Sequence, residues 1–232
     1  MTFRWLCLHG ATLNAEIFKI ELASIRYILE LDCDVEFEFI NAEVNGPKAQ
    51  TQDLYELFDG PHLYWWPDFF QGHQGDIDAA HGVVARAIEE LGPFDGIIGH
   101  SQGATLAFDI LLRHTMKRMN TGRDVISPFR CAVLIGGARS YDFWTTKTQT
   151  TMKKVDSSEL GLYIQQPALI VVGDEDDFPV MSEYHHIRDF WKEEACSLFV
   201  YKGHHGLPTD NPSNIELATE IKKLMSITKA IA

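Results

Sequence analysis

The chain has 232 residues, which is enough for one well-buried α/β domain and too few for two. Hydrophobic residues make up 45% and charged residues 23% of it, so the composition is that of a folded protein and excludes a largely disordered chain. The formal net charge of −13 at pH 7 argues against a nucleic acid as partner, because another polyanion would be repelled.

The amino-terminal residues and the cysteines bear on where the protein works. The first five residues lack the charged stretch and apolar core of a secretory signal, and no run approaches the length of a transmembrane helix. The four cysteines, Cys7, Cys33, Cys131 and Cys196, are scattered and form no Cys-x-x-Cys pair. We therefore expect a soluble, cytoplasmic protein with reduced structural cysteines, no membrane partner and no metal site.

Short apolar runs alternate along the chain with segments of helical periodicity, a pattern typical of a mostly parallel sheet with helices on both faces. The predicted strands are residues 5–8, 35–40, 94–99, 131–135, 168–172 and 197–201, and the predicted helices are residues 17–31, 77–91, 104–113 and 214–227. Neither an internal repeat nor an interdomain linker is evident. Residues 1–232 are thus predicted to form a single α/β domain.

Residues 44–76 depart from this alternation. They hold several glycines and prolines, together with the aromatic run Tyr64-Trp65-Trp66-Pro67 and then Phe69-Phe70. A loop of this length inside a compact domain is usually functional, and we interpret it as a cap insertion. Its rings either pack the cap onto the body or line an apolar pocket; the candidate substrate-binding residues are Thr12, Trp65, Trp66 and Phe69.

The strongest local signal is Gly99-His100-Ser101-Gln102-Gly103, which lies where an apolar strand ends and an apolar helix begins. A serine on such a sharp strand-to-helix turn needs a glycine on each side, because side chains at those positions would clash. The turn also places the serine at a helix N-terminus, where backbone N–H groups favour developing negative charge. Ser101 is therefore the candidate nucleophile.

A serine nucleophile needs a histidine base, which a carboxylate orients in turn. Only His204 and His205 lie in a loop directly after a strand, and the residues alone do not separate these two. The candidate acid follows strand 168–172, where the Gly-x-x-Asp spacing selects Asp176 and leaves Asp174 as the alternative.

The oxyanion of the expected intermediate requires two backbone N–H donors. One comes from the residue after the nucleophile and the other from the loop after the first strand, which reads His9-Gly10-Ala11-Thr12. Gln102 and Ala11 are the candidate donors. His9 is interpreted as a residue that braces this loop.

Taken together, several segments closely resemble the fungal serine hydrolase family of the α/β-hydrolase superfamily, which includes simple carboxylesterases and the offloading thioesterases of fungal polyketide biosynthesis. The segments are Leu6-Cys7-Leu8-His9-Gly10, Asn14-Ala15-Glu16-Ile17-Phe18, Gly92-Pro93-Phe94-Asp95-Gly96, Gly99-His100-Ser101-Gln102-Gly103-Ala104 and Gly203-His204-His205-Gly206-Leu207-Pro208. The resemblance implies an α/β-hydrolase fold and Asp176 as the acid. It also implies that the segment before Ile77 covers the pocket, and its register favours His205 because His204 replaces a family glycine.

The resemblance implies hydrolysis of an acyl ester or thioester through an acyl-enzyme intermediate, without a cofactor. The expected substrate is a small-molecule acyl compound, with an acyl carrier protein of a polyketide synthase as a candidate partner. The basic residues between Arg113 and Lys154 form either an ordinary solvated helix and loop surface or a docking face for such an acidic carrier. The alternatives are a general carboxylesterase and a ligand-binding protein that keeps the fold without turnover.

Overall fold

The structure is a computed structural model that describes residues 1–47, 60–67, 74–122, 126–139, 141–145, 150–176 and 180–231. At residues 74, 141–145, 150–153 and 180–182 only the backbone is described. Phe69 and much of the predicted cap therefore lie outside the described residues.

Six parallel strands form the central sheet, in the order β10-β9-β6-β5-β1-β2. The strands are β1 (Phe3–Leu8), β2 (Val35–Ile40), β5 (Gly96–His100), β6 (Cys131–Ile135), β9 (Ala168–Gly173) and β10 (Cys196–Tyr201). The chain builds outward from β1 in one direction to β2 and in the other through β5 to β10. Ligands in such open sheets bind at the carboxyl ends of the strands where this direction switches, which here is between β1 and β5.

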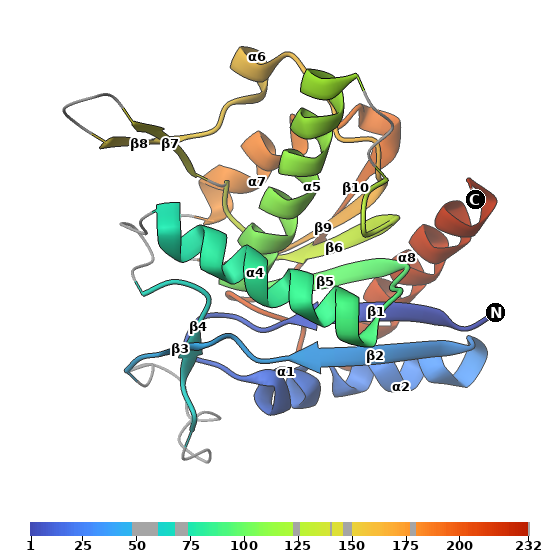
Figure 1. Cartoon of the computed structure of the whole chain (residues 1–232). Helices are drawn as coiled ribbons and strands as arrows, with labels where there is room; N and C mark the ends of the chain where they lie inside the picture. Colours follow the sequence, from blue (N-terminus) through green and yellow to red (C-terminus); the bar gives the residue numbers. More distant parts are fainter. Residues whose placement is uncertain are drawn as a thin grey trace.

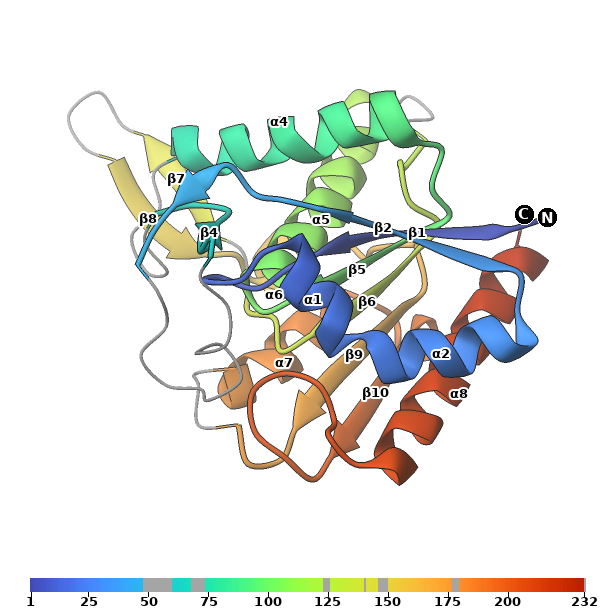
Figure 2. The ribbon, with the colours of Figure 1, turned by 90° about the horizontal axis from the view of Figure 1, so that it is seen from below.

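Helices cover both faces of the sheet (Figures 1 and 2). On one face lie α4 (Gln74–Leu91) and α5 (Gln102–Thr121), and on the other lie α1 (Ala15–Glu21), α2 (Ala23–Asp32) and α8 (Asn211–Ala230). Successive strand residues alternate between the two cores: Leu6 and Leu8 face α4 and α5, whereas Trp5 and Cys7 face the other three helices. This two-sided burial explains why the strands read as continuous apolar runs. Among the described residues no helix is long and apolar enough to cross a bilayer.

Side-chain caps set where several helices begin. Asn14 Oδ1 accepts the N–H of Ile17 at the start of α1, and Asp210 caps α8 by accepting from Ser213. The predicted helix over residues 17–31 is in fact two helices, because Leu22 ends α1 and starts α2. Its φ of −81° and ψ of 0° bend the chain while the apolar spacing continues, so the periodicity did not reveal the break.

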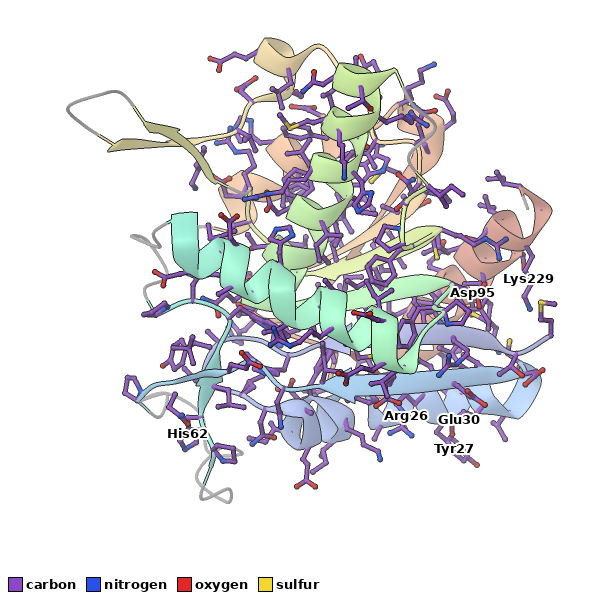
Figure 3. All side chains as sticks on the ribbon, viewed as in Figure 1. Arg26, Tyr27, Glu30, His62, Asp95 and Lys229 are labelled. Atoms are coloured by element: carbon purple, nitrogen blue, oxygen red, sulfur yellow. The ribbon has the colours of Figure 1, made fainter. Side chains whose placement is uncertain are left out.

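The smaller elements gather mainly around the carboxyl ends of the strands. Two short antiparallel ribbons pair β3 (Val44–Asn45) with β4 (Leu63–Tyr64) and β7 (Tyr141–Thr145) with β8 (Thr150–Lys154). The remaining helices are α6 (Ser157–Leu160), α7 (Val180–Arg188) and the 3₁₀ turn Glu193–Ala195. His62, next to β4, lies far from Asp95 and Lys229, which mark the opposite end of the molecule (Figure 3). The described part of the predicted cap, including β3, β4 and Trp65, thus lies at the switch-point end.

Candidate active site

Ser101 lies on a strained turn between β5 and α5. Its φ of 53° and ψ of −114° fall outside the regions that non-glycine residues usually occupy. The turn is held by a 2.7 Å hydrogen bond from Ser101 N to the carbonyl of Ile135 on the neighbouring strand. A Cβ atom at Gly99 would lie 2.4 Å from the carbonyl oxygen of Gly103, and one at Gly103 would lie 2.4 Å from that of Leu8. The two glycines therefore allow the close packing that holds Ser101 on this turn at the strand end, where it is 8% exposed.

His205 and Asp176 meet beside this turn. His205 Nδ1 lies 2.8 Å from Asp176 Oδ2, although 29 residues separate them. The Asp176 side chain is 1% exposed and that of His205 is 21% exposed, so the carboxylate is buried while the ring still reaches solvent. The ring lies against the end of β6, since a Cβ atom at Gly136 would be 2.9 Å from His205 Cε1. Because a carboxylate only accepts, Nδ1 carries the proton and Nε2 is left as the basic nitrogen.

The alternative residues have different positions. The His204 side chain is 75% exposed, and its Nδ1 lies 2.9 Å from the carbonyl of Glu175. Asp174 accepts a hydrogen bond from Gly203 N and thereby joins the acid loop to the histidine loop. The structure thus pairs His205, and not His204, with Asp176.

Tyr201, the last residue of β10, supports the loop that carries His205. Its hydroxyl lies within hydrogen-bond distance of the carbonyls of His204 (2.8 Å) and Gly206 (3.0 Å), on either side of that histidine. Burial raises the pKa of the Tyr201 hydroxyl, so it remains a neutral donor at physiological pH.

The loop after β1 lies against Ser101. A Cβ atom at Gly10 would be 3.3 Å from the Ser101 Cβ, which places the Gly10–Ala11 peptide next to the nucleophile. Within the described ranges, neither Ala11 N nor Gln102 N donates a backbone hydrogen bond. Unpaired N–H groups beside a serine are suited to bind an oxyanion.

Two buried histidines adjoin these groups and are neutral at physiological pH. Burial lowers the pKa of His9 to about 4 and that of His100 to about 3. His9 Nε2 accepts from Ala42 N at 3.0 Å, so the proton is on Nδ1, which donates to the carbonyl of Gly10 at 2.7 Å. The His100 ring stacks on Phe18 and lies 5.5 Å from the His205 ring, measured between centroids.

The predicted substrate-binding residues differ in where they lie. Trp65 and Trp66 are 2% and 6% exposed and belong to the core that includes α4 and α5. Thr12 has a φ of 70° and donates its N–H to the carbonyl of Leu63. Both tryptophans thus pack the cap onto the body, and a role for any of these residues, or for Phe69, in binding substrate stays a prediction.

The sequence analysis missed the contacts of the Gln102 side chain. Its Oε1 accepts from Trp65 N at 2.8 Å and its Nε2 donates to the carbonyl of Trp66 at 3.0 Å. No local pattern could have indicated these bonds, because the partners are 37 and 36 residues away and lie in the segment without periodicity.

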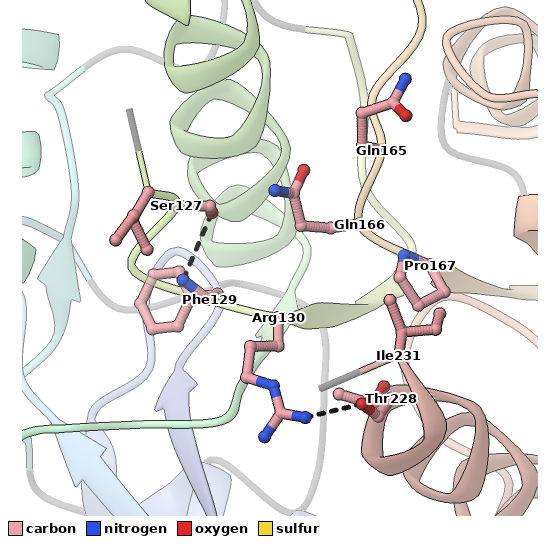
Figure 4. A pocket seen from close by; sticks show the side chains of 9 residues that line it. Ser127, Phe129, Arg130, Gln165, Gln166, Pro167, Thr228 and Ile231 are labelled. Carbon is pink, nitrogen blue, oxygen red and sulfur yellow. Dashed lines mark hydrogen bonds between the residues drawn. The ribbon is translucent and has the colours of Figure 1, made fainter. Parts of the chain in front are cut away.

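A cavity at the other end of the sheet is separate from this site. It has a volume of about 250 Å³ and lies beside the amino-terminal ends of β6 and β9, where Phe129, Arg130, Gln166 and Pro167 line it (Figure 4). Arg130 is held there by Asp95 and by the carbonyl of Thr228. In the described part of the chain, no group of three or more His, Cys, Asp or Glu side chains is arranged to hold a metal ion.

Comparison with known families identifies the class of protein. Residues 1–216 match the model of a family described as serine hydrolase (FSH1). The chain belongs to this serine hydrolase family. The resemblance inferred from its motifs is thereby confirmed, and the chain is a serine hydrolase.

Fungal relatives are similar in sequence to part or nearly all of this hydrolase. Hydrolase phiM of Talaromyces stipitatus is 36% identical over 56% of the chain and 52% of phiM, so the chain spans about half the length of that relative. Hydrolase FUB4 of Fusarium oxysporum f. sp. lycopersici is 28% identical over 76% of the chain and 70% of FUB4. Probable esterase tazC of Aspergillus terreus is 25% identical over 98% of the chain and 94% of tazC.

Solved structures show the fold. The carboxylesterase of Bacillus cereus superposes with a TM-score of 0.58 at 13% identity, covering 96% of this hydrolase and 89% of that chain. Arabidopsis thaliana SOBER1 superposes with a TM-score of 0.56 at 15% identity, covering 97% and 100%. The predicted α/β-hydrolase fold is confirmed.

Proposed function

We propose that this serine hydrolase cleaves an acyl ester or thioester with Ser101 as nucleophile, His205 as base and Asp176 as the orienting acid. The observation that carries the proposal is the 2.8 Å contact between His205 Nδ1 and the buried Asp176 carboxylate, next to the strained Ser101 turn. A neutral imidazole held in this tautomer can take a proton on Nε2, and the adjacent carboxylate stabilises the cation that forms.

In the proposed reaction, Ser101 Oγ attacks the acyl carbonyl carbon while its proton passes to His205 Nε2. The carbonyl oxygen becomes an oxyanion that accepts hydrogen bonds from the N–H groups of Ala11 and Gln102. The tetrahedral intermediate then expels the alcohol or thiol, which leaves with the proton from His205. Water attacks the resulting acyl-enzyme with His205 again as base, which releases the acid and restores the serine hydroxyl.

For the substrate, we propose a biosynthetic thioester, with acyl transfer from an acyl carrier protein to water. Support comes from the names of the fungal relatives, hydrolases and esterases, and from the motif resemblance described above. Three of the basic residues between Arg113 and Lys154 are paired with carboxylates of the same chain. Arg113 pairs with Asp109 and Asp78, Arg130 pairs with Asp95, and Arg139 pairs with Glu183. Each of these cations is already neutralised by a carboxylate of the same chain.

The test compares one acyl group presented in three ways: as a p-nitrophenyl ester, as an N-acetylcysteamine thioester and on an acyl carrier protein. We expect hydrolysis of all three, a higher kcat/KM for the carrier-bound thioester, and a loss of more than about 10⁴-fold in Ser101→Ala. Turnover of the ester with no action on either thioester would contradict the thioesterase proposal and favour a general carboxylesterase. Unchanged hydrolysis in folded Ser101→Ala would contradict the mechanism itself.

A further inference from the structure

We propose that the Trp65–Trp66 segment of the cap positions both N–H donors of the oxyanion site, through the side chains of Gln102 and His9. The proposal rests on the proposed function, because it assigns a role to residues around the same nucleophile. Gln102, His9 and Trp65 are positioning residues in this account, and the reacting atoms touch only the backbone N–H groups of Gln102 and Ala11.

The first donor is fixed through Gln102. This residue is 0% exposed, and its side-chain amide bonds to the backbone on either side of the Trp65–Trp66 peptide, at Trp65 N and at the carbonyl of Trp66. An amide whose oxygen accepts from one peptide group while its NH₂ donates to another is held in a single orientation. The side chain therefore ties the first turn of α5, where the Gln102 N–H lies, to the cap segment.

The second donor is fixed through His9. Its Nδ1–H donates to the carbonyl oxygen of Gly10, which also accepts from Leu13 N at 3.2 Å. That carbonyl and the N–H of Ala11 belong to one planar trans peptide, so the two groups point in opposite directions. Holding the Gly10 oxygen toward His9 thus turns the Ala11 N–H away from His9.

Trp65 contacts both Gln102 and His9 and so connects the two donors. Its Nε1 donates to the carbonyl of His9 at 2.8 Å, and its ring stacks on the His9 ring at 5.2 Å with 30° between the planes. The same residue donates its backbone N–H to Gln102. Displacement of the Trp65–Trp66 segment would therefore disrupt the hydrogen bonds of Gln102 and of the His9 loop at the same time.

The chemical consequence is a coupling between cap position and stabilisation of the transition state. A hydrogen-bond donor accelerates acyl transfer only when it lies about 3 Å from the developing oxyanion, so a small rotation of either peptide lowers kcat more than it alters substrate binding. Rings that bind an acyl chain directly would affect KM instead. The two roles can be separated by kinetics.

The experiment measures kcat and KM for a matched pair of esters that differ only in carbonyl oxygen against carbonyl sulfur. Sulfur is a weak acceptor, so the oxoester-to-thionoester rate ratio reports the oxyanion donors specifically. The variants are Gln102→Leu, which removes both amide bonds, and Trp65→Phe, which keeps a ring and removes the bond to His9. Tyr64→Phe is the matched control, because its hydroxyl bonds to the carbonyl of Pro47 on the cap and not to the oxyanion loop.

We expect Gln102→Leu and Trp65→Phe to lower kcat for the oxoester by about 10- to 100-fold, with KM and the thionoester rate much less affected. The Tyr64→Phe ratio should match the wild type. Equal losses for both esters, or an unchanged ratio, would overturn the proposal. If Gln102→Leu does not fold, Trp65→Phe alone carries the test, because it removes the bond to the His9 carbonyl and the same change in the ratio is expected. Ser101→Ala run in parallel separates the claims. Wild-type activity in that variant would overturn the proposed function and the positioning role with it, whereas loss of activity there together with an unchanged ratio in Gln102→Leu and Trp65→Phe would overturn the positioning role alone.

Discussion

His100 precedes the nucleophile and is an unusual residue to bury. It is 4% exposed, and neither ring nitrogen has a hydrogen-bond partner among the described residues. The Glu21 carboxylate is 3.6 Å from its Nδ1, beyond hydrogen-bond distance. Burial lowers the pKa of His100 to about 3, from about 6.5 in an unfolded chain. Since the unfolded state then binds a proton that the folded state does not, stability falls as the pH drops below about 6.5 toward 3.

His100→Phe removes this titrating group and keeps a flat ring that can still stack on Phe18. We expect the variant to be at least as stable as the wild type at pH 7.5, because a buried unpaired polar group is lost. Between pH 7.5 and pH 5 the wild type should lose about 2 kcal/mol of unfolding free energy more than the variant. Urea denaturation at the two pH values measures this difference. Equal losses in the two proteins would show that His100 does not carry the effect.

How far single residues could be predicted depended on the range of their contacts. Ser101 was predictable because strand, turn and helix are consecutive in the sequence. The pairing of His205 with Asp176 spans 29 residues. The choice between His204 and His205 depended on aligning this loop with the motif of the family. The partners of Gln102 had no sequence signal, since a side-chain amide can bond to any exposed peptide group.

At the scale of elements, the periodicity predicted the strands of the central sheet to within a few residues and the large helices in outline. It missed β7 and β8, because a two-stranded ribbon outside the main sheet has no apolar run to mark it. Glu183 of α7, which is 5% exposed, links this ribbon to α7. Its carboxylate accepts from Arg139 Nε at 2.8 Å and Lys154 Nζ at 2.7 Å.

Glu183→Gln should destabilise the fold, because two partly buried cations lose their anion. Burial alone would raise the pKa of Glu183, but hydrogen bonds from Arg139 and Lys154 outweigh it and lower the pKa to about 2. For a carboxyl whose pKa is lowered, the stabilisation is present above the unfolded value of about 4.3 and is lost as the pH falls toward 2. We therefore expect a loss of about 2 kcal/mol that is the same at pH 8 and pH 5.

Chemical denaturation at both pH values tests this, with Asp156→Asn as the control. Asp156 Oδ2 lies 3.8 Å from Nη1 of the same Arg139, but the Asp156 side chain is more exposed than that of Glu183. Loss of its charge should therefore change stability much less. A Glu183→Gln variant as stable as the wild type would contradict a structural role for this cluster.

At the scale of the whole molecule, the order of the strands brings the site together. Because β1 and β5 are neighbours at the switch point, the loop of Ala11 and the turn of Ser101 meet at one edge, and β9 and β10 bring Asp176 and His205 to the same edge. Alternating strands and helices predicted a parallel sheet, but the strand order depends on how the helices pack against each face. That packing is a property of the folded chain and cannot be read from any single segment.

The most direct test of the account is to find where a fluorophosphonate probe attaches to the folded protein, by intact mass and peptide mass spectrometry. We predict one adduct, on Ser101, that is absent in Ser101→Ala, slowed strongly in His205→Ala and unaffected in His204→Ala. Folded protein that stays unlabelled, an adduct on another residue, or labelling that depends on His204 and not His205 would contradict the assignment.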